Sequence, residues 1–235
     1  MKAFIALLLF SVLALNAQEL KIVTLPDSIN SKTKCLNKDF LVFSPIKRSG
    51  KTPLILFLHG MGERGSDVNK IKKHGPTKFL QKNNDFNFIV VSPQCTKDEK
   101  GKGWWNSNDL TLLLDFIKKK YNIDEKRIYL TGLSMGGFGS WALAAHTPKT
   151  FAAVAPICGG GSPNNAKKYG KLPIWAFHGD KDTVVKLEKS KVMVDAVKKA
   201  GGNAKLTIYP GVKHNSWTQT YNNAELYKWF LRHSR

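Results

Sequence analysis

The segment with the clearest chemical potential is Gly132-Leu133-Ser134-Met135-Gly136, which reads Gly-x-Ser-x-Gly. An apolar, β-branched run precedes it and a stretch of small residues suited to a helix follows, so Ser134 is expected at a sharp strand-to-helix turn. Such a turn exposes the hydroxyl above the sheet, and glycines on either side avoid collisions with the neighbouring strand and helix. A glycine-rich turn that only packs a helix on a strand is the alternative. The strand-turn-helix context favours a nucleophile, and the Met135 amide at the helix start is a candidate oxyanion donor.

A serine nucleophile needs a base, and the base needs a carboxylate to orient it. In folds with this turn the order along the chain is Ser, Asp, His, and both partners occur downstream. Asp180 and Asp182 follow one predicted strand, and His214 follows the last one. Parallel strands bring these loops to the sheet edge where Ser134 is expected. His214 is the predicted base, because the other histidines precede Asp182 except His233, which lies next to the C-terminus.

The elements that must position these residues are short strands alternating with helix-period stretches. Apolar residues at helical spacing predict helices over 110–121 and 193–200. This alternation predicts an α/β fold, with a mainly parallel sheet of about seven to eight strands flanked by helices. The predicted strands are Asp39–Phe43, Leu54–Leu58, Phe88–Val91, Arg127–Thr131, Phe151–Ala155, Ile174–Phe177 and Ala204–Tyr209.

The N-terminus has the pattern of a signal peptide. Lys2 precedes a short apolar stretch, and Ala17 provides a small residue at the predicted cleavage point. A membrane anchor is the alternative, but the apolar run is shorter than the roughly 18 to 20 residues that span a bilayer. We therefore expect a signal peptide at 1–17, a single domain at 18–235 without a transmembrane anchor, and export to the periplasm or the medium.

The chain is strongly basic, with 37 Lys and Arg against 17 Asp and Glu and a formal net charge of +20. Such a charge attracts anionic surfaces, so an acidic polymer is a candidate partner. Lys97, Lys100 and Lys102 flank the Trp104-Trp105 pair and could act near a substrate cleft. Lysines that only keep the protein soluble are the alternative. Specific nucleic-acid binding is not expected, because the lysines are spread over several predicted elements and no nucleic-acid motif is present.

Cys35, Cys95 and Cys158 allow at most one internal disulfide. Their spacing matches neither a CxxC redox motif nor a zinc site, and we expect at least one buried free thiol and no metal.

Taken together, four motifs resemble those of α/β-hydrolases in the group of feruloyl and acetyl-xylan esterases, polyhydroxybutyrate depolymerases and dienelactone-hydrolase-like carboxylesterases. The resemblance covers the chain from about Phe40 onward and follows the same motif order. The motifs are Phe57 to Gly65, Gly132 to Gly137, His178 to Val185, and His214 with Trp217 behind it.

This resemblance implies a serine carboxylic ester hydrolase that works through an acyl-enzyme and needs no cofactor. It assigns the acid to Asp182, the aspartate of His-Gly-x-x-Asp-x-x-Val, and leaves Asp180 at a variable position. It also assigns the second oxyanion amide to Met61, the residue after His-Gly. Ser134 replaces the cysteine of true dienelactone hydrolases, so lactone hydrolysis does not carry over.

The substrate class follows less directly from the residues. Trp104, Trp105 and Trp217 are expected in loops near the site, where aromatic walls would suit a phenolic acyl group or a sugar ring. Indoles that fill the rim of the core are the alternative. The loop at 158–171 is too short for a large lipase lid, which favours short-acyl or phenolic esters of a carbohydrate or a polyester. The competing hypotheses are a prolyl-oligopeptidase-like serine peptidase, disfavoured because no propeller segment precedes the turn, and a non-catalytic polyanion-binding protein on a hydrolase fold.

Overall fold

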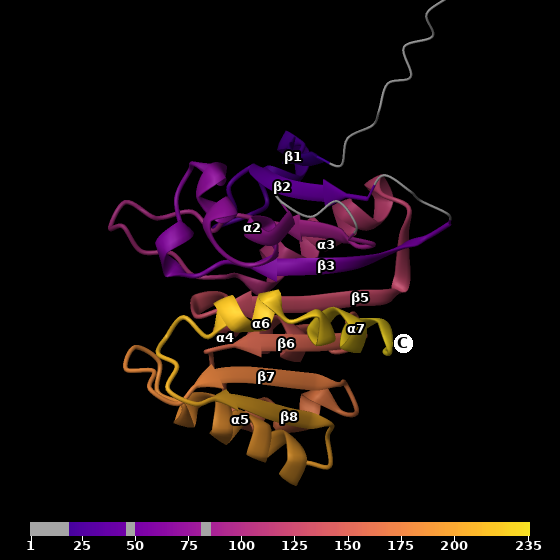
Figure 1. Ribbon diagram of the computed structural model, residues 1–235. Coiled ribbons are helices and arrows are strands. Elements are labelled where there is room, and N and C mark those ends of the chain that lie inside the picture. Colours follow the sequence, from indigo (N-terminus) through magenta and orange to yellow (C-terminus); the bar gives the residue numbers. More distant parts are fainter. Residues whose placement is uncertain (1–18, 46–49, 81–85) are drawn as a thin grey trace, which may run out of the picture.

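An eight-stranded sheet forms the centre of the computed structural model, which describes residues 19–45, 50–80 and 86–235. The strand order is β1-β2-β4-β3-β5-β6-β7-β8 (Figure 1). Strands β3 to β8 are parallel to their neighbours among themselves, whereas β2 is antiparallel to both β1 and β4. The strands are β1 (Glu19–Thr24), β2 (Asp39–Ser44), β3 (Thr52–Leu58), β4 (Ile89–Ser92), β5 (Ile123–Leu133), β6 (Ala153–Ile157), β7 (Ile174–Gly179) and β8 (Ala204–Tyr209).

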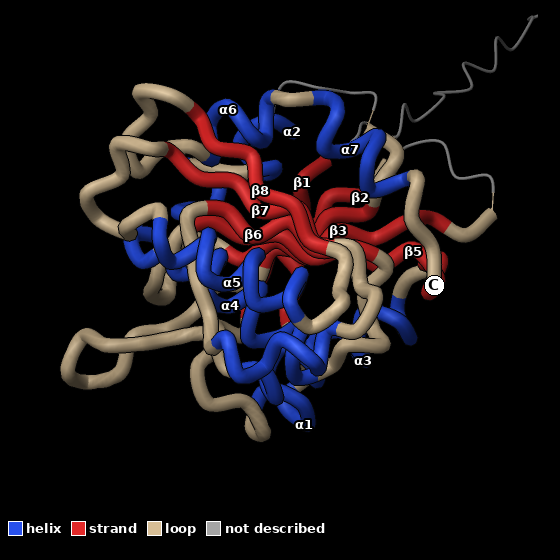
Figure 2. Tube along the Cα trace, turned by 90° about the horizontal axis from the view of Figure 1, so that it is seen from below, coloured by secondary structure: helices blue, strands red, loops and turns tan. Residues whose placement is uncertain are grey.

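Helices cover both faces of the sheet (Figure 2). One face carries α1 (Asp27–Asn30), α3 (Ser107–Lys120), α4 (Met135–His146) and α5 (Glu188–Lys199). The other carries α2 (Pro76–Leu80), α6 (Trp217–Asn222) and α7 (Ala224–Leu231). The described residues also form three short 3₁₀ segments, η1 (Met61–Glu63), η2 (Val68–Lys73) and η3 (Pro163–Tyr169).

The alternation of side chains along the central strands divides the interior into two hydrophobic cores. On β3, Leu54 and Leu56 join the core under α3, α4 and α5, whereas Ile55 and Phe57 join the core under α2, α6 and α7. All seven residues of β3 are buried, as expected for a central parallel strand covered on both faces. The sheet is therefore packed on both faces beneath the site, whose loops follow the carboxyl ends of the strands.

The predicted α/β-hydrolase architecture is confirmed, and all seven predicted strands are present. Strand β5 begins at Ile123, four residues before the predicted start, and α3 begins at Ser107. Strand β1 was not predicted. Among the described strands it is an edge strand that pairs with β2 alone. Because Ile22 is half exposed, backbone pairing forms this strand without a clear apolar pattern. The predicted signal peptide at 1–17 lies outside the described residues.

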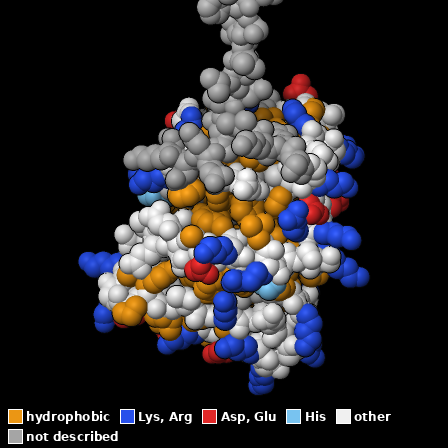
Figure 3. Space-filling view, turned by 45° about the vertical axis from the view of Figure 1, so that its right-hand side comes forward, with side chains coloured by type: hydrophobic (Ala, Val, Ile, Leu, Met, Phe, Trp, Pro, Cys, Tyr) orange, Lys and Arg blue, Asp and Glu red, His pale blue; other side chains and the backbone are white. Residues whose placement is uncertain are grey.

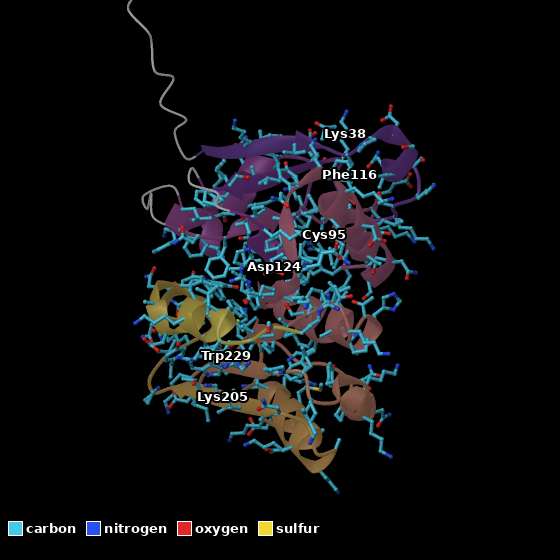
Figure 4. The ribbon with its side chains drawn as sticks, turned by 90° about the vertical axis from the view of Figure 1, so that its right-hand side faces the viewer. Lys38, Cys95, Phe116, Asp124, Lys205 and Trp229 are labelled. Carbon is cyan, nitrogen blue, oxygen red and sulfur yellow. The ribbon has the colours of Figure 1, made fainter. Side chains whose placement is uncertain are left out.

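Basic side chains are spread over the surface, and one of them, on the edge strand β8, packs over two indole rings. Figure 3 shows Lys and Arg side chains distributed around a hydrophobic area on one face. Lys205 on β8 places its ammonium 3.5 Å from the ring centre of Trp175 and 5.7 Å from that of Trp229 on α7 (Figure 4). A lysine on an edge strand discourages pairing with another chain.

Within the described residues, none of the helices combines the length and apolar character needed to cross a bilayer. All three cysteines are free thiols, and Cys95 and Cys158 are buried, which confirms the expectation of at least one buried thiol.

Candidate active site

Ser134 occupies the predicted turn between β5 and α4, with φ of +53° and ψ of −116°. A side chain other than glycine in this region costs on the order of 1–3 kcal/mol and persists only where the surroundings hold it. Here the Ser134 N–H donates to the carbonyl of Ile157 at the end of β6, at 2.9 Å. This strained backbone conformation places the serine hydroxyl above the sheet edge.

The two glycines of the motif are required by close backbone packing. A Cβ atom at Gly132 would overlap the carbonyl oxygen of Gly136, and one at Gly136 would overlap the carbonyl oxygen of Leu58. The first turn of α4 is thus pressed against the ends of β5 and β3. This is the collision that the sequence pattern predicted.

His214 connects Ser134 to Asp182. Its Nε2 lies 2.9 Å from Oγ of Ser134, and its Nδ1 lies 2.7 Å from Oδ2 of Asp182. A carboxylate can only accept, so Nδ1 carries the proton and Nε2 is free to accept from the serine hydroxyl. The three side chains come from the ends of β5, β7 and β8, and the parallel sheet brings them to one edge.

Asp182 is oriented by four N–H groups. Its Oδ1 accepts from the backbone N–H of Val184 and of Val185, both at 2.9 Å. Its Oδ2 lies 2.7 Å from Nδ1 of His214 and 3.2 Å from Nε2 of His178. The carboxylate is fully buried, so these donors replace water and hold the side chain in one orientation.

His178 supports this carboxylate from behind. Its Nε2 lies 2.8 Å from the carbonyl of Val185, and its Nδ1 lies 2.7 Å from Oγ of Ser190 on α5. Because the Val185 carbonyl and Asp182 both accept, Nε2 must carry a proton, and burial lowers the pKa of His178. Chain order excludes His178 as the base, and the sequence by itself indicates no other role for it. Its position four residues before Asp182 was the available signal.

Asp180 has a different position, although it is only two residues from Asp182. Its Oδ1 accepts from the backbone N–H of Gly211 at 2.7 Å, and the backbone of Lys181 donates to the carbonyl of Val212 at 2.9 Å. Asp180 therefore ties its own loop to the loop that carries His214, without contacting the imidazole.

The two residues predicted to supply oxyanion donors each begin a helical segment. Met61 is the first residue of η1 and Met135 the first of α4. Amides in the first turn of a helix have no acceptor within that helix, so both are available to a ligand. Gly60 packs against Leu133, since a Cβ atom there would lie 2.8 Å from Cδ1 of the leucine. This contact places the start of η1 beside the turn at Ser134.

His59 holds the loop before Met61. Its Nδ1 lies 2.6 Å from the carbonyl of Gly60, and its Nε2 accepts the backbone N–H of Cys95 at 2.9 Å. The side chain is buried, and this burial lowers its pKa to about 4. A neutral imidazole thus serves as a structural bridge between the loops after β3 and β4.

The three tryptophans predicted to contact substrate have different environments. Trp217 packs edge to face against His214, with ring centres 5.2 Å apart. Trp104 is 48% exposed and packs at 6.0 Å against Phe138, one turn into α4. Trp105 is only 6% exposed, and its Nε1 donates to the carbonyl of His59 at 3.2 Å. The expectation that Trp105 contacts substrate is therefore wrong, since its indole fills the core. The adjacent indoles of Trp104 and Trp105 point in different directions.

Cys158 is buried beside Asp182 and His214. It follows β6 with φ of +39°, and its sulfur, an Asp182 carboxylate oxygen and a His214 ring nitrogen all lie within 4.8 Å of one another. Burial raises the pKa of the thiol to about 12. A sulfur, a carboxylate oxygen and an imidazole nitrogen at this spacing are a ligand set that suits a soft metal ion. The spacing in the sequence did not suggest this cluster, which the fold assembles from separate loops.

Comparison with known families places these motifs in context. The family model "Dienelactone hydrolase family" matches residues 96–227, more than half of the chain. The chain belongs to this family.

Several proteins similar to this member of the dienelactone hydrolase family have esterase names. The bifunctional acetylxylan esterase/xylanase XynS20E of Neocallimastix patriciarum is 31% identical over 163 residues, covering 65% of this chain and 22% of that protein. The probable feruloyl esterase C of Aspergillus flavus is 26% identical and covers 83% of this chain and 74% of that protein. A thermostable esterase of known structure superimposes with a TM-score of 0.75 at 31% identity, over 92% of this chain and 63% of that chain. The group named from the sequence motifs is confirmed, although this chain spans less than two thirds of the first and third of these proteins.

Proposed function

We propose that the protein hydrolyses carboxylic esters, with Ser134 as nucleophile, His214 as general base and Asp182 as the group that orients the imidazole. The observation that carries this proposal is the 2.9 Å contact between Oγ of Ser134 and Nε2 of His214, made at a strained turn. The 2.7 Å contact to Asp182 keeps the accepting nitrogen of His214 directed at the serine.

In the first half of the proposed reaction, Oγ of Ser134 attacks the ester carbonyl carbon and its proton passes to Nε2 of His214. The carbonyl oxygen becomes an oxyanion, which the amides of Met61 and Met135 stabilise by hydrogen bonds. The imidazolium then donates its proton to the leaving alcohol, and an acyl-enzyme remains.

In the second half, water replaces the alcohol. His214 takes a proton from the water as the water oxygen attacks the acyl carbon. The imidazolium then returns this proton to Oγ of Ser134 as the bond between the acyl carbon and Oγ breaks, and the acid is released. Every proton moves between Ser134, His214, water and substrate, so the reaction as proposed requires no cofactor.

The proposed substrates are short-acyl or phenolic esters of a carbohydrate or a polyester. The acetylxylan and feruloyl esterases among the similar proteins support this class. Trp104 and Met61 are both about half exposed beside the turn, which supports an open, partly apolar cleft. We further propose that residues 18–235 act as one exported domain and that the basic surface in Figure 3 favours acidic polymers as carriers of the ester.

The deciding experiment combines a fluorophosphonate probe with turnover of p-nitrophenyl acetate. The wild type and the Ser162→Ala control, which alters an exposed loop serine, should be labelled and active. The Ser134→Ala variant should be neither. Labelling of Ser134→Ala would reject the proposed nucleophile, and preferential cleavage of a peptide p-nitroanilide would favour a peptidase instead. An unlabelled, inactive wild type would favour the non-catalytic hypothesis.

A further inference from the structure

A groove of about 270 Å³ lies between α2 and α6, on the face of the sheet opposite α4. We call it the α2–α6 groove, and its polar and aromatic lining consists mainly of His74, Lys78, Phe79, Trp217, Thr218 and Asn222. These side chains belong to the segment just before α2, to α2 itself and to one face of α6. None of them has a role in the proposed reaction.

The groove is joined to the proposed catalytic centre by one indole ring. Trp217 contacts His214 with ring centres 5.2 Å apart and contacts His74 with ring centres 5.5 Å apart. In ester hydrolysis the leaving alcohol receives its proton from the imidazole, so the leaving oxygen must approach Nε2 of His214. The alcohol portion of an ester therefore extends on the His214 side, where Trp217 leads to the groove.

The lining combines aromatic surface with positive charge. Trp217 and Phe79 provide apolar ring faces, which suit the flat faces of a sugar or another ring. Lys78 is exposed at the groove and lies near enough to His74 to contribute to lowering the pKa of His74, which burial lowers most. Among the described lining residues there is no carboxylate. The nearby Glu63 is buried and lies 3.8 Å from Nε2 of His74.

Polar side chains also line the groove. Nε1 of Trp217 is buried and has no hydrogen-bond partner in the described part of the chain. Thr218 and Asn222 add a hydroxyl and an amide on the same face of α6, where a ring substituent would lie. An aromatic platform beside a cation, a hydroxyl and an amide is suited to a polar ring that carries a negative charge.

We propose that the α2–α6 groove is the subsite for the alcohol side of the ester and that it takes a ring bearing a carboxylate, as in a uronate sugar. This inference rests on the proposed function. The ring packs on Trp217, its carboxylate pairs with Lys78, and its hydroxyl groups reach Thr218 and Asn222. This groove is then a local source of preference for an acidic carrier, in addition to the general attraction of the basic surface.

The kinetic test uses one acyl group carried on a uronate sugar and on the matching neutral sugar. Lys78→Ala should raise KM for the uronate ester about five- to tenfold, with kcat and the neutral ester little changed. Lys78→Arg should retain most of the preference. Lys70→Ala on η2 removes an exposed lysine that does not line the groove, so it should leave both esters unchanged.

A binding test separates this subsite from the chemistry. Calorimetry with the Ser134→Ala variant should show binding of a uronate oligomer that weakens with Lys78→Ala, and no binding of the neutral oligomer at the same concentrations. Equal KM and equal binding for the acidic and neutral carriers would overturn the proposed subsite, and so would equal changes in Lys70→Ala and Lys78→Ala. Either result would leave the esterase proposal intact. If the wild type hydrolyses no ester, the proposed function fails, and the calorimetry still decides whether the groove binds a uronate.

Discussion

Ser134 and His214 are 80 residues apart in the sequence, yet Oγ of the serine lies 2.9 Å from Nε2 of the histidine. The contact depends on two loops at the carboxyl ends of β5 and β8, with β6 and β7 between them. The sheet thus sets the distance between nucleophile and base.

The first prediction concerns this pair. Ser134→Ala and His214→Ala should each lower kcat for a short p-nitrophenyl ester by about 10⁶, because neither residue can work without the other. The double variant should lose no more than either single variant. Steady-state kinetics on purified proteins measure this, and substantial turnover by Ser134→Ala would be incompatible with the proposed mechanism.

The second prediction separates the two aspartates. Asp182→Asn should lower kcat by about 10⁴, because an amide facing Nδ1 favours the wrong imidazole tautomer. Asp180→Asn should cost far less, because Asp180 contacts the backbone of Gly211 rather than His214. A comparison of kcat for the two variants decides it. A larger loss at Asp180 would reverse the assignment.

The third prediction concerns stability against acid. The pKa of His59 is lowered to about 4 in the folded protein, so between pH 6.5 and pH 4 the unfolded chain binds a proton that the folded chain does not. The free energy of unfolding should therefore fall through this window as the pH decreases, by about 3 kcal/mol from His59.

Urea denaturation at several pH values tests this contribution. His59→Asn should be less stable at pH 7 but should lose less stability on acidification. His146→Asn, which alters an exposed histidine at the end of α4, should follow the wild type. The same acid sensitivity in His59→Asn and the wild type would show that His59 is not the group responsible.

The fourth prediction concerns the thiol beside the site. Burial raises the pKa of Cys158 to about 12, so the native protein should not react with iodoacetamide at this position at pH 8. Peptide mapping by mass spectrometry should find Cys158 modified only after denaturation. Rapid alkylation in the native state would mean that the thiol is accessible or ionised.

Local patterns in the sequence determined much of this protein. Short β-branched and aromatic runs predicted seven of the eight described strands, and helical apolar spacing predicted the helices at 110–121 and 193–200. The context of Gly-x-Ser-x-Gly predicted the turn at Ser134. Chain order selected His214. These features depend on near neighbours along the chain, where side-chain size and backbone preference act directly. Strand β1 was not predicted, because it is defined by its pairing with β2 and not by a local pattern.

The tertiary structure alone decided which side chains meet. Asp180 and Asp182 follow the same strand, and in the sequence only the family resemblance distinguishes them. In the structure their contacts differ, because one carboxylate points toward the Gly211 backbone and the other toward His214. In the folded protein the Trp105 side chain is buried, His178 lies beside Asp182, and the sulfur of Cys158 lies close to His214. Each of these depends on the direction of a side chain and on contacts between distant segments. Composition and spacing carry neither kind of information, because the parallel sheet creates these contacts only when it forms.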